Sequence, residues 1–127
     1  MADPASYRYS ESHEWFSVDG DVVTAGITQY AADELTDITY VELKDVGDAI
    51  DAGGAIGEVE SVKTTSDVYS VVGGEITEIN QAVVDDPSIL NRAPAGEGWL
   101  VRMKVSDLAP LDGLMDKATY DEKYPVG

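Results

Sequence analysis

Residues 55–70 read AIGEVESVKTTSDVYS, and this stretch organises the predicted fold. Its valine- and isoleucine-containing runs are typical of short strands, which are expected at Ala55–Val62 and Asp67–Val72. The segment Ser61–Ser66 joins the two runs and carries a single lysine, Lys63. The stretch therefore predicts a β-hairpin with Lys63 at or near its tip.

A short motif, Val-Gly-x-x-Ile, occurs on both sides of this hairpin, at Val46–Ile50 and at Val72–Ile76. The two copies are centred on position 61, so two similar turn-and-strand units would flank the hairpin in a pseudo-symmetric arrangement. Strands that begin with glycine also recur by chance in β proteins, so the motif alone leaves this arrangement open.

A second hairpin is predicted nearer the start of the chain, from Glu14–Val18 and Asp21–Ala25. The dipeptide Asp19-Gly20 between them suits a type I′ turn, which needs positive φ angles. Thr28 is placed to cap a short helix over Gln29–Leu35. These elements are followed by a β-rich run at Ile38–Leu43.

The rest of the chain continues the mainly β pattern and then changes period. A strand is expected at Glu75–Ile79, and a later one places Trp99, Val101, Met103 and Val105 on the core side, with Trp15 and Trp99 as core anchors. Leu111, Leu114, Met115 and Ala118 recur at helical spacing, and Thr119 with Glu122 suggests a capping box before Pro125. We expect one domain over residues 1–127, with its core at about 7–124 and a C-terminal helix.

The charge of the chain limits its partners. It has 25 acidic and 8 basic residues, a formal net charge of −17. Nucleic-acid affinity comes largely from Lys and Arg, so nucleic acid is not an expected partner. Repulsion among so many acids is relieved by concentrated salt, which favours an origin in a halophilic organism.

The residue inventory also narrows the chemistry. There is no cysteine and one histidine, His13, so thiolate metal sites, zinc clusters and Ser-His-Asp triads are not expected. We interpret His13 as a structural residue near the sheet edge. No apolar run approaches the ~20 residues of a membrane span, and Met1–Pro4 does not begin a signal peptide. A cytoplasmic monomer without membrane contact is expected.

Four stretches of the chain resemble a known family. Glu60–Ser70 (ESVKTTSDVYS) resembles the lipoylation segment of glycine cleavage system H proteins. Tyr9–Trp15 (YSESHEW) is similar to the N-terminal signature of that family, and parts of Gly26–Leu43 and of Asn91–Leu100 are similar to its central and late signatures. The stretches keep the family's order and cover roughly residues 7 to 124.

This resemblance implies a fold, a cofactor and a set of partners. The fold would be the mainly β barrel-sandwich hybrid of lipoyl and biotinyl carriers. Lys63 would carry lipoic acid as an amide, without itself catalysing a reaction. The chain would take an aminomethyl group from a pyridoxal-phosphate glycine decarboxylase to a tetrahydrofolate-dependent aminomethyltransferase. Dihydrolipoamide dehydrogenase and lipoate-attaching enzymes would be further partners.

The resemblance also assigns a cleft for the loaded arm. Ser12, Glu14 and Asp67 match positions at which family members line that cleft, and a carboxylate there would stabilise a cationic aminomethyl amine. In so acidic a chain, Glu14 and Asp67 could equally be solvated acids at strand ends. The structure has to decide whether these three side chains come together.

Lys63 also allows other interpretations. A Schiff-base enzyme is disfavoured because Glu58, Glu60 and Asp67 favour the protonated, unreactive amine. A biotin carrier would resemble Met-Lys-Met, whereas Val62 and Thr64 flank this lysine. The Pro/Ala-rich linker expected beside a 2-oxoacid dehydrogenase lipoyl domain is not found. An H-like donor that relays lipoate to other enzymes stays open, as does an unmodified interaction module.

Overall fold

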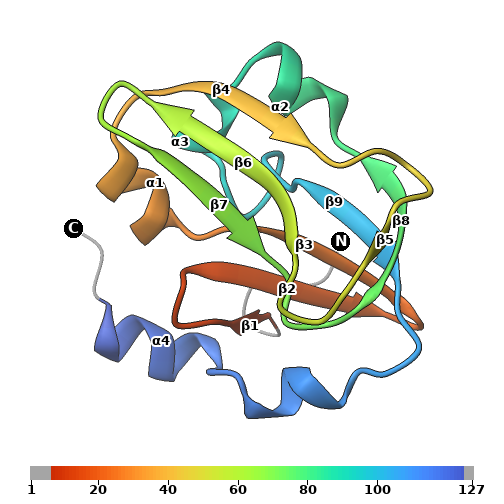
Figure 1. Ribbon diagram of the computed structural model, residues 1–127. Helices are drawn as coiled ribbons and strands as arrows, with labels where there is room; N and C mark the ends of the chain where they lie inside the picture. The colour runs from red at the N-terminus through yellow and green to blue at the C-terminus, as the bar shows by residue number, and fades with distance from the viewer. Residues whose placement is uncertain (1–6, 125–127) are drawn as a thin grey trace.

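The computed structural model describes residues 7–124, which form two antiparallel β-sheets (Figure 1). The larger sheet has the strand order β1-β2-β3-β9-β8-β5 and the smaller one β4-β6-β7. In the larger sheet the strands are β1 Arg8–Tyr9, β2 Glu14–Asp19, β3 Val22–Ile27, β9 Val101–Lys104, β8 Gly74–Ile79 and β5 Ala49–Ile50. In the smaller sheet they are β4 Ile38–Leu43, β6 Ala55–Ser61 and β7 Thr65–Tyr69.

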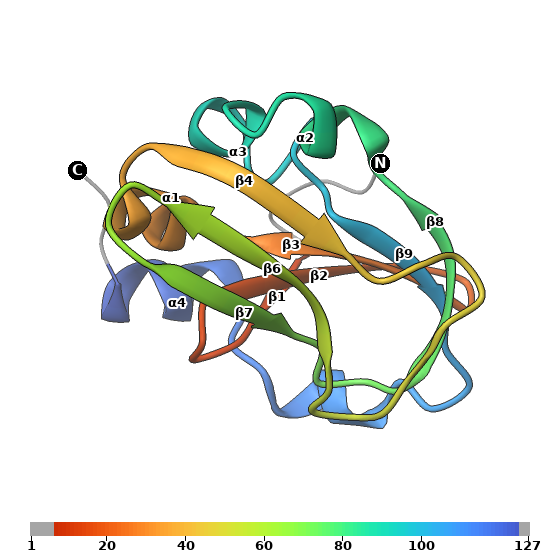
Figure 2. The same ribbon diagram turned by 45° about the horizontal axis from the view of Figure 1, so that its top comes forward.

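Short helices cover the ends and sides of the two sheets (Figure 2). They are α1 Gln29–Leu35, α2 Gln81–Asp85, α3 Ile89–Arg92 and α4 Lys117–Lys123, with a 3-10 helix at Ala109–Gly113. Both views place α2 and α4 on opposite sides of the sheets, and the β6–β7 loop beside α1. The expected mainly β fold with a C-terminal helix is confirmed. No helix within residues 7–124 is long and apolar enough to cross a membrane.

Two clusters of buried side chains form the core. The main cluster draws on both sheets, with Val41, Val59 and Val68 from the smaller one and Val23, Ile76 and Met103 from the larger one. The second cluster is aromatic and joins the start of the chain to α4; its buried members are Tyr7, Tyr9, Trp15 and Tyr120. Trp15 is fully buried, as predicted for a core anchor.

The two copies of the Val-Gly-x-x-Ile motif lie side by side. Ala49 pairs with Glu75 in the antiparallel β5–β8 ladder, and the Gly47 amide donates to the Ile76 carbonyl at 2.8 Å. The hairpin between the copies is β6–β7, whose loop contains Lys63. The motif alone left this arrangement open, and the structure shows the two copies paired with each other on either side of the lysine-bearing hairpin in the chain.

The β2–β3 hairpin forms as predicted, but its turn lies one residue later. Asp19 pairs with Val22, so Gly20 and Asp21 are the central residues. Only Gly20 of these two has a positive φ, 63°. A type I′ turn requires positive φ at both central residues, whereas glycine with positive φ at the first is the type II′ pattern. The predicted type I′ turn at Asp19-Gly20 is wrong because Asp19 still belongs to the strand.

Strand β7 starts and ends earlier than predicted. Its last residue is Tyr69, because Ser70 turns the chain out of the sheet. The Ser70 hydroxyl donates to the Val72 carbonyl at 2.6 Å and accepts from the Val72 amide at 3.2 Å. A serine that bonds to nearby backbone in this way competes with the strand ladder.

The alternating pattern predicted from Trp99 onward holds only from Val101 to Val105. Val101, Met103 and Val105 are buried as expected, but Leu100 is also fully buried and Trp99 is only half-buried. Trp99 lies under the Arg102 guanidinium, 4.0 Å from its ring centroid. Trp99 nevertheless packs against the aromatic core cluster, so its predicted core role holds in part, and the predicted alternation fails at Trp99 and Leu100 because the strand begins only after these two residues.

The C-terminal helix is capped differently from the prediction. Asp116 is the N-cap of α4, and its carboxylate accepts from the Thr119 amide at 2.8 Å. The predicted capping box of Thr119 with Glu122 is therefore wrong. The helical spacing read from the sequence spans two elements, the 3-10 helix that contains Leu111 and α4. Pro125, expected to end the helix, lies outside the described residues.

Candidate functional site: an exposed lysine and a buried glutamate

The loop that carries Lys63 is held by a single buried serine, Ser61. Its hydroxyl oxygen accepts from the amides of Lys63 and Thr64, both at 3.1 Å, and its hydroxyl donates to the Thr64 carbonyl at 3.1 Å. The Val62 amide donates to the Asp37 carbonyl at 3.1 Å and so attaches the loop to the segment between α1 and β4. The position of the lysine backbone is thus fixed by hydrogen bonds on both sides.

The Lys63 side chain itself is exposed and lightly held. Among the described residues, its amine donates only to the Glu34 carbonyl in α1, at 3.3 Å. None of the ion pairs found within residues 7–124 includes Lys63. An exposed amine with one weak contact is accessible to an acylating enzyme, so the residues present fit a lysine-linked group.

Glu14, at the start of β2, differs from Lys63 in being buried, with 2% of its surface exposed. Its Oε1 atom accepts from the hydroxyls of Ser10, at 2.6 Å, and of Ser12. Its Oε2 atom accepts from the Tyr69 amide at 3.0 Å. Because β7 is an edge strand, this last bond joins the smaller sheet to the larger one through a carboxylate.

The structure brings two of the three predicted cleft residues into contact. Ser12 bonds directly to Glu14, whereas Asp67 is exposed on β7 and bonds to the Tyr69 hydroxyl at 3.3 Å. Tyr69 therefore links the two acids, with its amide on Glu14 and its hydroxyl on Asp67. The adjacent Asp67 carboxylate raises the pKa of the Tyr69 phenol.

Sequence reasoning missed Ser10 and Tyr69 as partners of Glu14. Ser10 lies in the same N-terminal stretch as Ser12 and Glu14, so its polar side chain was a usable signal. Tyr69 contributes its backbone amide, which every residue except proline has. That contact therefore left no trace in the sequence.

His13 packs as a structural residue between Ser12 and Glu14. Its Nδ1 atom is 2.8 Å from the Tyr120 hydroxyl, and its ring contacts Tyr30 and Tyr124 at centroid distances of 4.6 and 4.7 Å. Burial lowers the pKa of His13, while the carboxylates of Glu14 and Glu34 act in the opposite direction. No group of acids and histidine within residues 7–124 is placed to hold a metal ion.

Comparison with known proteins decides the family. The family model described as glycine cleavage H-protein matches residues 7–125 of the chain. The chain belongs to the glycine cleavage H-protein family. Members of this family are non-catalytic carriers of the glycine cleavage system and bear lipoate on a lysine. Membership implies glycine decarboxylase, aminomethyltransferase and dihydrolipoamide dehydrogenase as the partner enzymes.

Individual H proteins are similar over nearly the whole chain. A glycine cleavage system H protein of Parasynechococcus marenigrum is 46% identical over 124 residues, 98% of this chain and 96% of the relative. One from Thermus thermophilus is 47% identical over 122 residues, 96% and 95% of the two chains. The crystal structure of an H protein from Mycobacterium marinum matches with a TM-score of 0.86 and 34% identity, over 98% of this chain and all of that one. The expected barrel-sandwich fold is confirmed.

Several residues of the H-protein signatures have structural roles here. Asn91 accepts from the Ile38 amide at 3.0 Å and donates to the Thr36 carbonyl at 2.6 Å, so it fixes the chain between α1 and β4. The Trp15 indole donates to the Pro94 carbonyl at 2.9 Å. These contacts join stretches far apart in the sequence.

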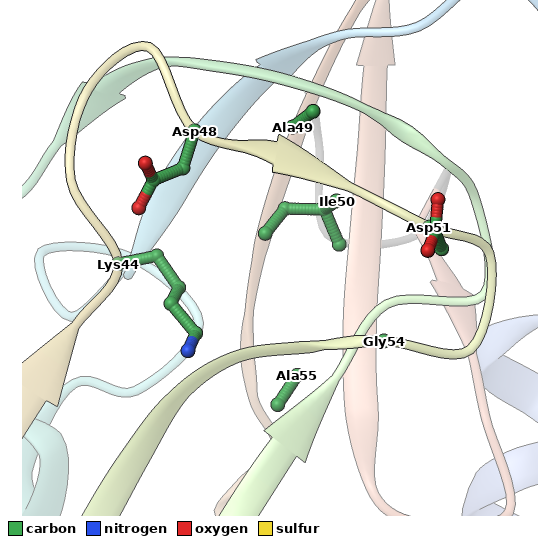
Figure 3. Close-up of a pocket in the computed structure, with 7 residues that line it drawn as sticks. All are labelled: Lys44, Asp48, Ala49, Ile50, Asp51, Gly54 and Ala55. Carbon is green, nitrogen blue, oxygen red and sulfur yellow. The ribbon is translucent and has the colours of Figure 1, made fainter.

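Hollows of different size lie outside the lysine loop of this H-protein family member. One, of about 480 Å³, lies beside the predicted cleft; its lining includes Ser10, Ser12, Val71, Leu114 and Met115. Another, of about 310 Å³, lies at the end of the molecule opposite the β6–β7 loop (Figure 3). Its Lys44 side chain points into the space between β5 and the start of β6, with Asp48 above it. The first hollow adjoins Ser12, and Asp67 lines a further, smaller hollow of about 80 Å³ on the smaller sheet.

Proposed function

We propose that the chain acts as a single lipoyl-carrier domain in which Lys63 bears the lipoate. The observation that carries this assignment is the exposed amine on a hydrogen-bonded hairpin tip, within the segment that resembles the family's lipoylation site. Acylation would replace one weak contact with Glu34 and would not expose any buried group. The attachment needs no rearrangement of the fold.

The bound lipoate would supply a disulfide that opens as it takes up the aminomethyl group. The protein would supply a rigid scaffold for the attachment point, since Ser61 and Asp37 hold the loop backbone. Tethering raises the effective concentration of the carried group at each partner without requiring tight docking. This division of work suits a carrier that visits several enzymes in turn.

We also propose that the loaded arm folds back along β7 towards Asp67, Ser12 and Glu14. Asp67 lies two residues into β7 from the loop, and Tyr69, whose amide meets Glu14, lies two residues further, a step of roughly 7 Å along a strand. A cationic amine on the arm would thus pass the exposed Asp67 before it reached Glu14. Loss of the aminomethyl group from the arm requires water to cleave the bond between the lipoyl sulfur and the aminomethyl carbon, which gives a thiol, formaldehyde and ammonia.

The structure indicates which group would yield to the arm at Glu14. Of the three donors to the carboxylate, only the Ser12 side chain belongs to an exposed residue with a freely rotating hydroxyl. Ser10 is buried, and the Tyr69 amide is fixed in β7. A charged amine could displace the Ser12 hydroxyl and gain a stronger, charge-assisted hydrogen bond.

We also propose the attaching enzymes, the cellular location, the oligomeric state and the origin of the chain. Lipoate-attaching enzymes are the partners that an apo carrier with an accessible lysine requires. The chain would work as a cytoplasmic monomer, since its exposed surface is highly acidic and copies of it repel one another. The same charge supports an origin in a halophile.

Peptide mass mapping of protein from its native host tests the central proposal. Lipoyl should be found on Lys63 and on none of Lys44, Lys104, Lys117 and Lys123. Lys63→Arg should keep the fold, because the lysine amine makes only one contact, and should abolish aminomethyl transfer. Lipoyl on another lysine would contradict the assignment, and transfer of lipoate from Lys63 to a second protein would favour the relay function.

A further inference from the structure

The C-terminal helix α4 touches the turn that contains Ser12 and Glu14. We propose that α4 positions the Glu14 carboxylate, acting through the hydrogen bond between Tyr120 and His13. Tyr120 and His13 are in this view positioning residues, and neither touches the arm. The inference rests on the proposed role of Glu14 towards the loaded arm.

Tyr120 is the central link because its hydroxyl makes two short contacts. It lies 2.8 Å from His13 Nδ1 and 2.8 Å from the Thr28 hydroxyl oxygen. If His13 Nδ1 is unprotonated, Tyr120 donates to it and accepts from Thr28. The ring is 3% exposed, and burial raises the pKa of Tyr120 to about 12, so the phenol keeps its proton near neutral pH.

The position of Tyr120 is fixed because α4 is anchored to β1. Just before the helix, Met115 exchanges two backbone hydrogen bonds with Tyr9 of β1, at 2.8 and 3.0 Å. The Tyr9 and Tyr120 rings stack with their centroids 4.8 Å apart. Figure 1 shows α4 beside β1 and the loop that leads into β2. The helix is therefore attached to the same strand from which that loop departs.

His13 is the residue of the loop before β2 whose backbone conformation has to be held in place by its neighbours. Its φ is 71°, in the left-handed region that residues with a Cβ rarely adopt. Its amide donates to the Ser10 carbonyl at 3.1 Å, and its carbonyl accepts from Thr28 at 3.0 Å. A residue held in this region persists only when its surroundings fix it. Among the described residues, the hydrogen bond that the His13 side chain makes is the one to Tyr120.

The conformation of His13 sets the direction in which Glu14 leaves the loop. Ser10 and Glu14 close the turn, with the Ser10 amide donating to the Glu14 carbonyl at 2.9 Å. The carboxylate then has to meet two hydroxyls and the Tyr69 amide at once. If His13 relaxed from positive φ, Glu14 would turn away from Tyr69. That amide would then lose its acceptor.

Amide hydrogen exchange of Tyr69 in lipoate-free protein tests the link without any activity assay. Tyr120→Phe keeps the stacked ring and removes the hydroxyl, and it should speed exchange of the Tyr69 amide about threefold to tenfold, the range that one ordinary hydrogen bond implies. Tyr7→Phe is the matched control, because Tyr7 is a buried tyrosine of the same aromatic cluster that bonds to Ala95 instead. It should leave exchange at Tyr69 unchanged.

His13→Asn is the second variant, for the case that Tyr120→Phe folds poorly. Asparagine tolerates positive φ but is too short to reach Tyr120, so it should reproduce the faster exchange. Unchanged exchange in both variants would overturn the proposal. Faster exchange that appeared equally in Tyr7→Phe would also overturn it, because it would show general loosening of the cluster.

The lifetime of the loaded arm gives the functional readout. Tyr120→Phe should shorten it about threefold to tenfold, while reoxidation of the unloaded arm by dihydrolipoamide dehydrogenase stays unchanged. Because Tyr120 acts through Glu14, it should have no further effect in a Glu14→Gln background. Additive effects would overturn the positioning role. If Glu14→Gln alone had no effect, the proposed role of Glu14 would fail, and exchange at Tyr69 would still decide the positioning.

Discussion

At the scale of single residues, Glu14 differs from all other acids in the described part of the chain. Among residues 7–124 it is the one acidic residue that is buried, and the other acids there face water. Burying a carboxylate is costly unless hydrogen bonds replace its water, and three donors do so here. No buried side-chain nitrogen or oxygen of residues 7–124 lacks a partner, so the arrangement is complete before any arm arrives.

Glu14→Ala should leave lipoylation of Lys63 intact and shorten the lifetime of the loaded arm about tenfold to a hundredfold. The reason is loss of a charge-assisted hydrogen bond, worth roughly 1.5–3 kcal/mol, to a cationic amine. The measurement is release of ammonia and formaldehyde without tetrahydrofolate, at the native salt concentration. Glu75→Ala, at an exposed acid on β8 away from the hollow beside the predicted cleft, is the control. Equal release from Glu14→Ala and the unchanged protein would remove the protective role of Glu14.

His13 should give the chain a pH dependence of stability that can be assigned without ambiguity, since it is the single histidine. Burial lowers its pKa in the folded chain below 6.5, against the opposing effect of Glu14 and Glu34. The unfolded chain therefore binds a proton more readily, and the free energy of unfolding should fall as pH drops from 6.5 through the folded-state pKa.

Denaturant unfolding between pH 7.5 and 5.5 measures this effect. Burial raises the pKa of Tyr120, which bonds to His13, to about 12, so this phenol keeps its proton throughout that range. His13→Asn should show a shallower fall than the unchanged chain. Equal slopes in the two proteins would contradict the stated direction of the pKa shift.

Local sequence could predict that Lys63 lies at an exposed hairpin tip, because the lysine stands alone in a hairpin segment. Its choice as the attachment site came from family resemblance, as did the choice of Glu14 and Ser12. The structure shows the last two in contact. The separation of Asp67 from Glu14 was not predictable, because it depends on how the edge of β7 meets β2 across two sheets.

At the scale of elements, strand identity was easier to predict than strand limits. The helix α1 and the strand β4 have the predicted bounds, since a capping threonine and a β-rich run mark them in the sequence. The turn at Gly20 and the end of β7 at Tyr69 differ from prediction because both are decided by pairing between strands. Register is a tertiary property that turn residues alone constrain weakly.

Gly26 in β3 offers a test of packing between elements. A Cβ added there would lie 2.8 Å from three atoms of the Trp15 indole. That ring cannot move easily, because it stacks on Tyr7 at 4.6 Å and bonds to Pro94. Gly26→Ala should therefore lower the free energy of unfolding by roughly 1–3 kcal/mol.

Gly96→Ala is the matched control for this substitution. A Cβ at Gly96 meets no atom within 4 Å. In urea titrations of both variants, the free energy of unfolding of the Gly96→Ala protein should stay close to that of the unchanged chain. A Gly26→Ala protein as stable as Gly96→Ala would mean that Trp15 can shift without cost, contrary to the packing described.

At the scale of the whole molecule, few of the described acidic side chains pair with a basic one. Ion pairs found within residues 7–124 are Arg92–Asp86, Arg102–Glu78 and Lys117–Asp121, all at the surface. Exposed pairs of this kind contribute little to stability. Across the smaller sheet, Glu42 pairs with Glu58 and Glu58 with Asp67, so three exposed carboxylates lie opposite one another. Like charges in directly opposite positions destabilise a sheet.

This charge distribution makes stability depend on salt. With 25 acids against 8 bases, repulsion acts over the whole domain, and the Debye length falls from about 10 Å at 0.1 M to about 3 Å at 1 M salt. The midpoint of thermal unfolding should therefore rise as potassium chloride increases over the molar range. Glu58→Gln removes the central charge of the row and should stabilise the chain by up to about 1 kcal/mol at low salt. Most of that gain should vanish in concentrated salt, because screening then already relieves the same repulsion. A midpoint that stays flat or falls with salt would remove the argument for a halophilic origin, while the carrier function, which depends on Lys63 and the fold, would be unaffected.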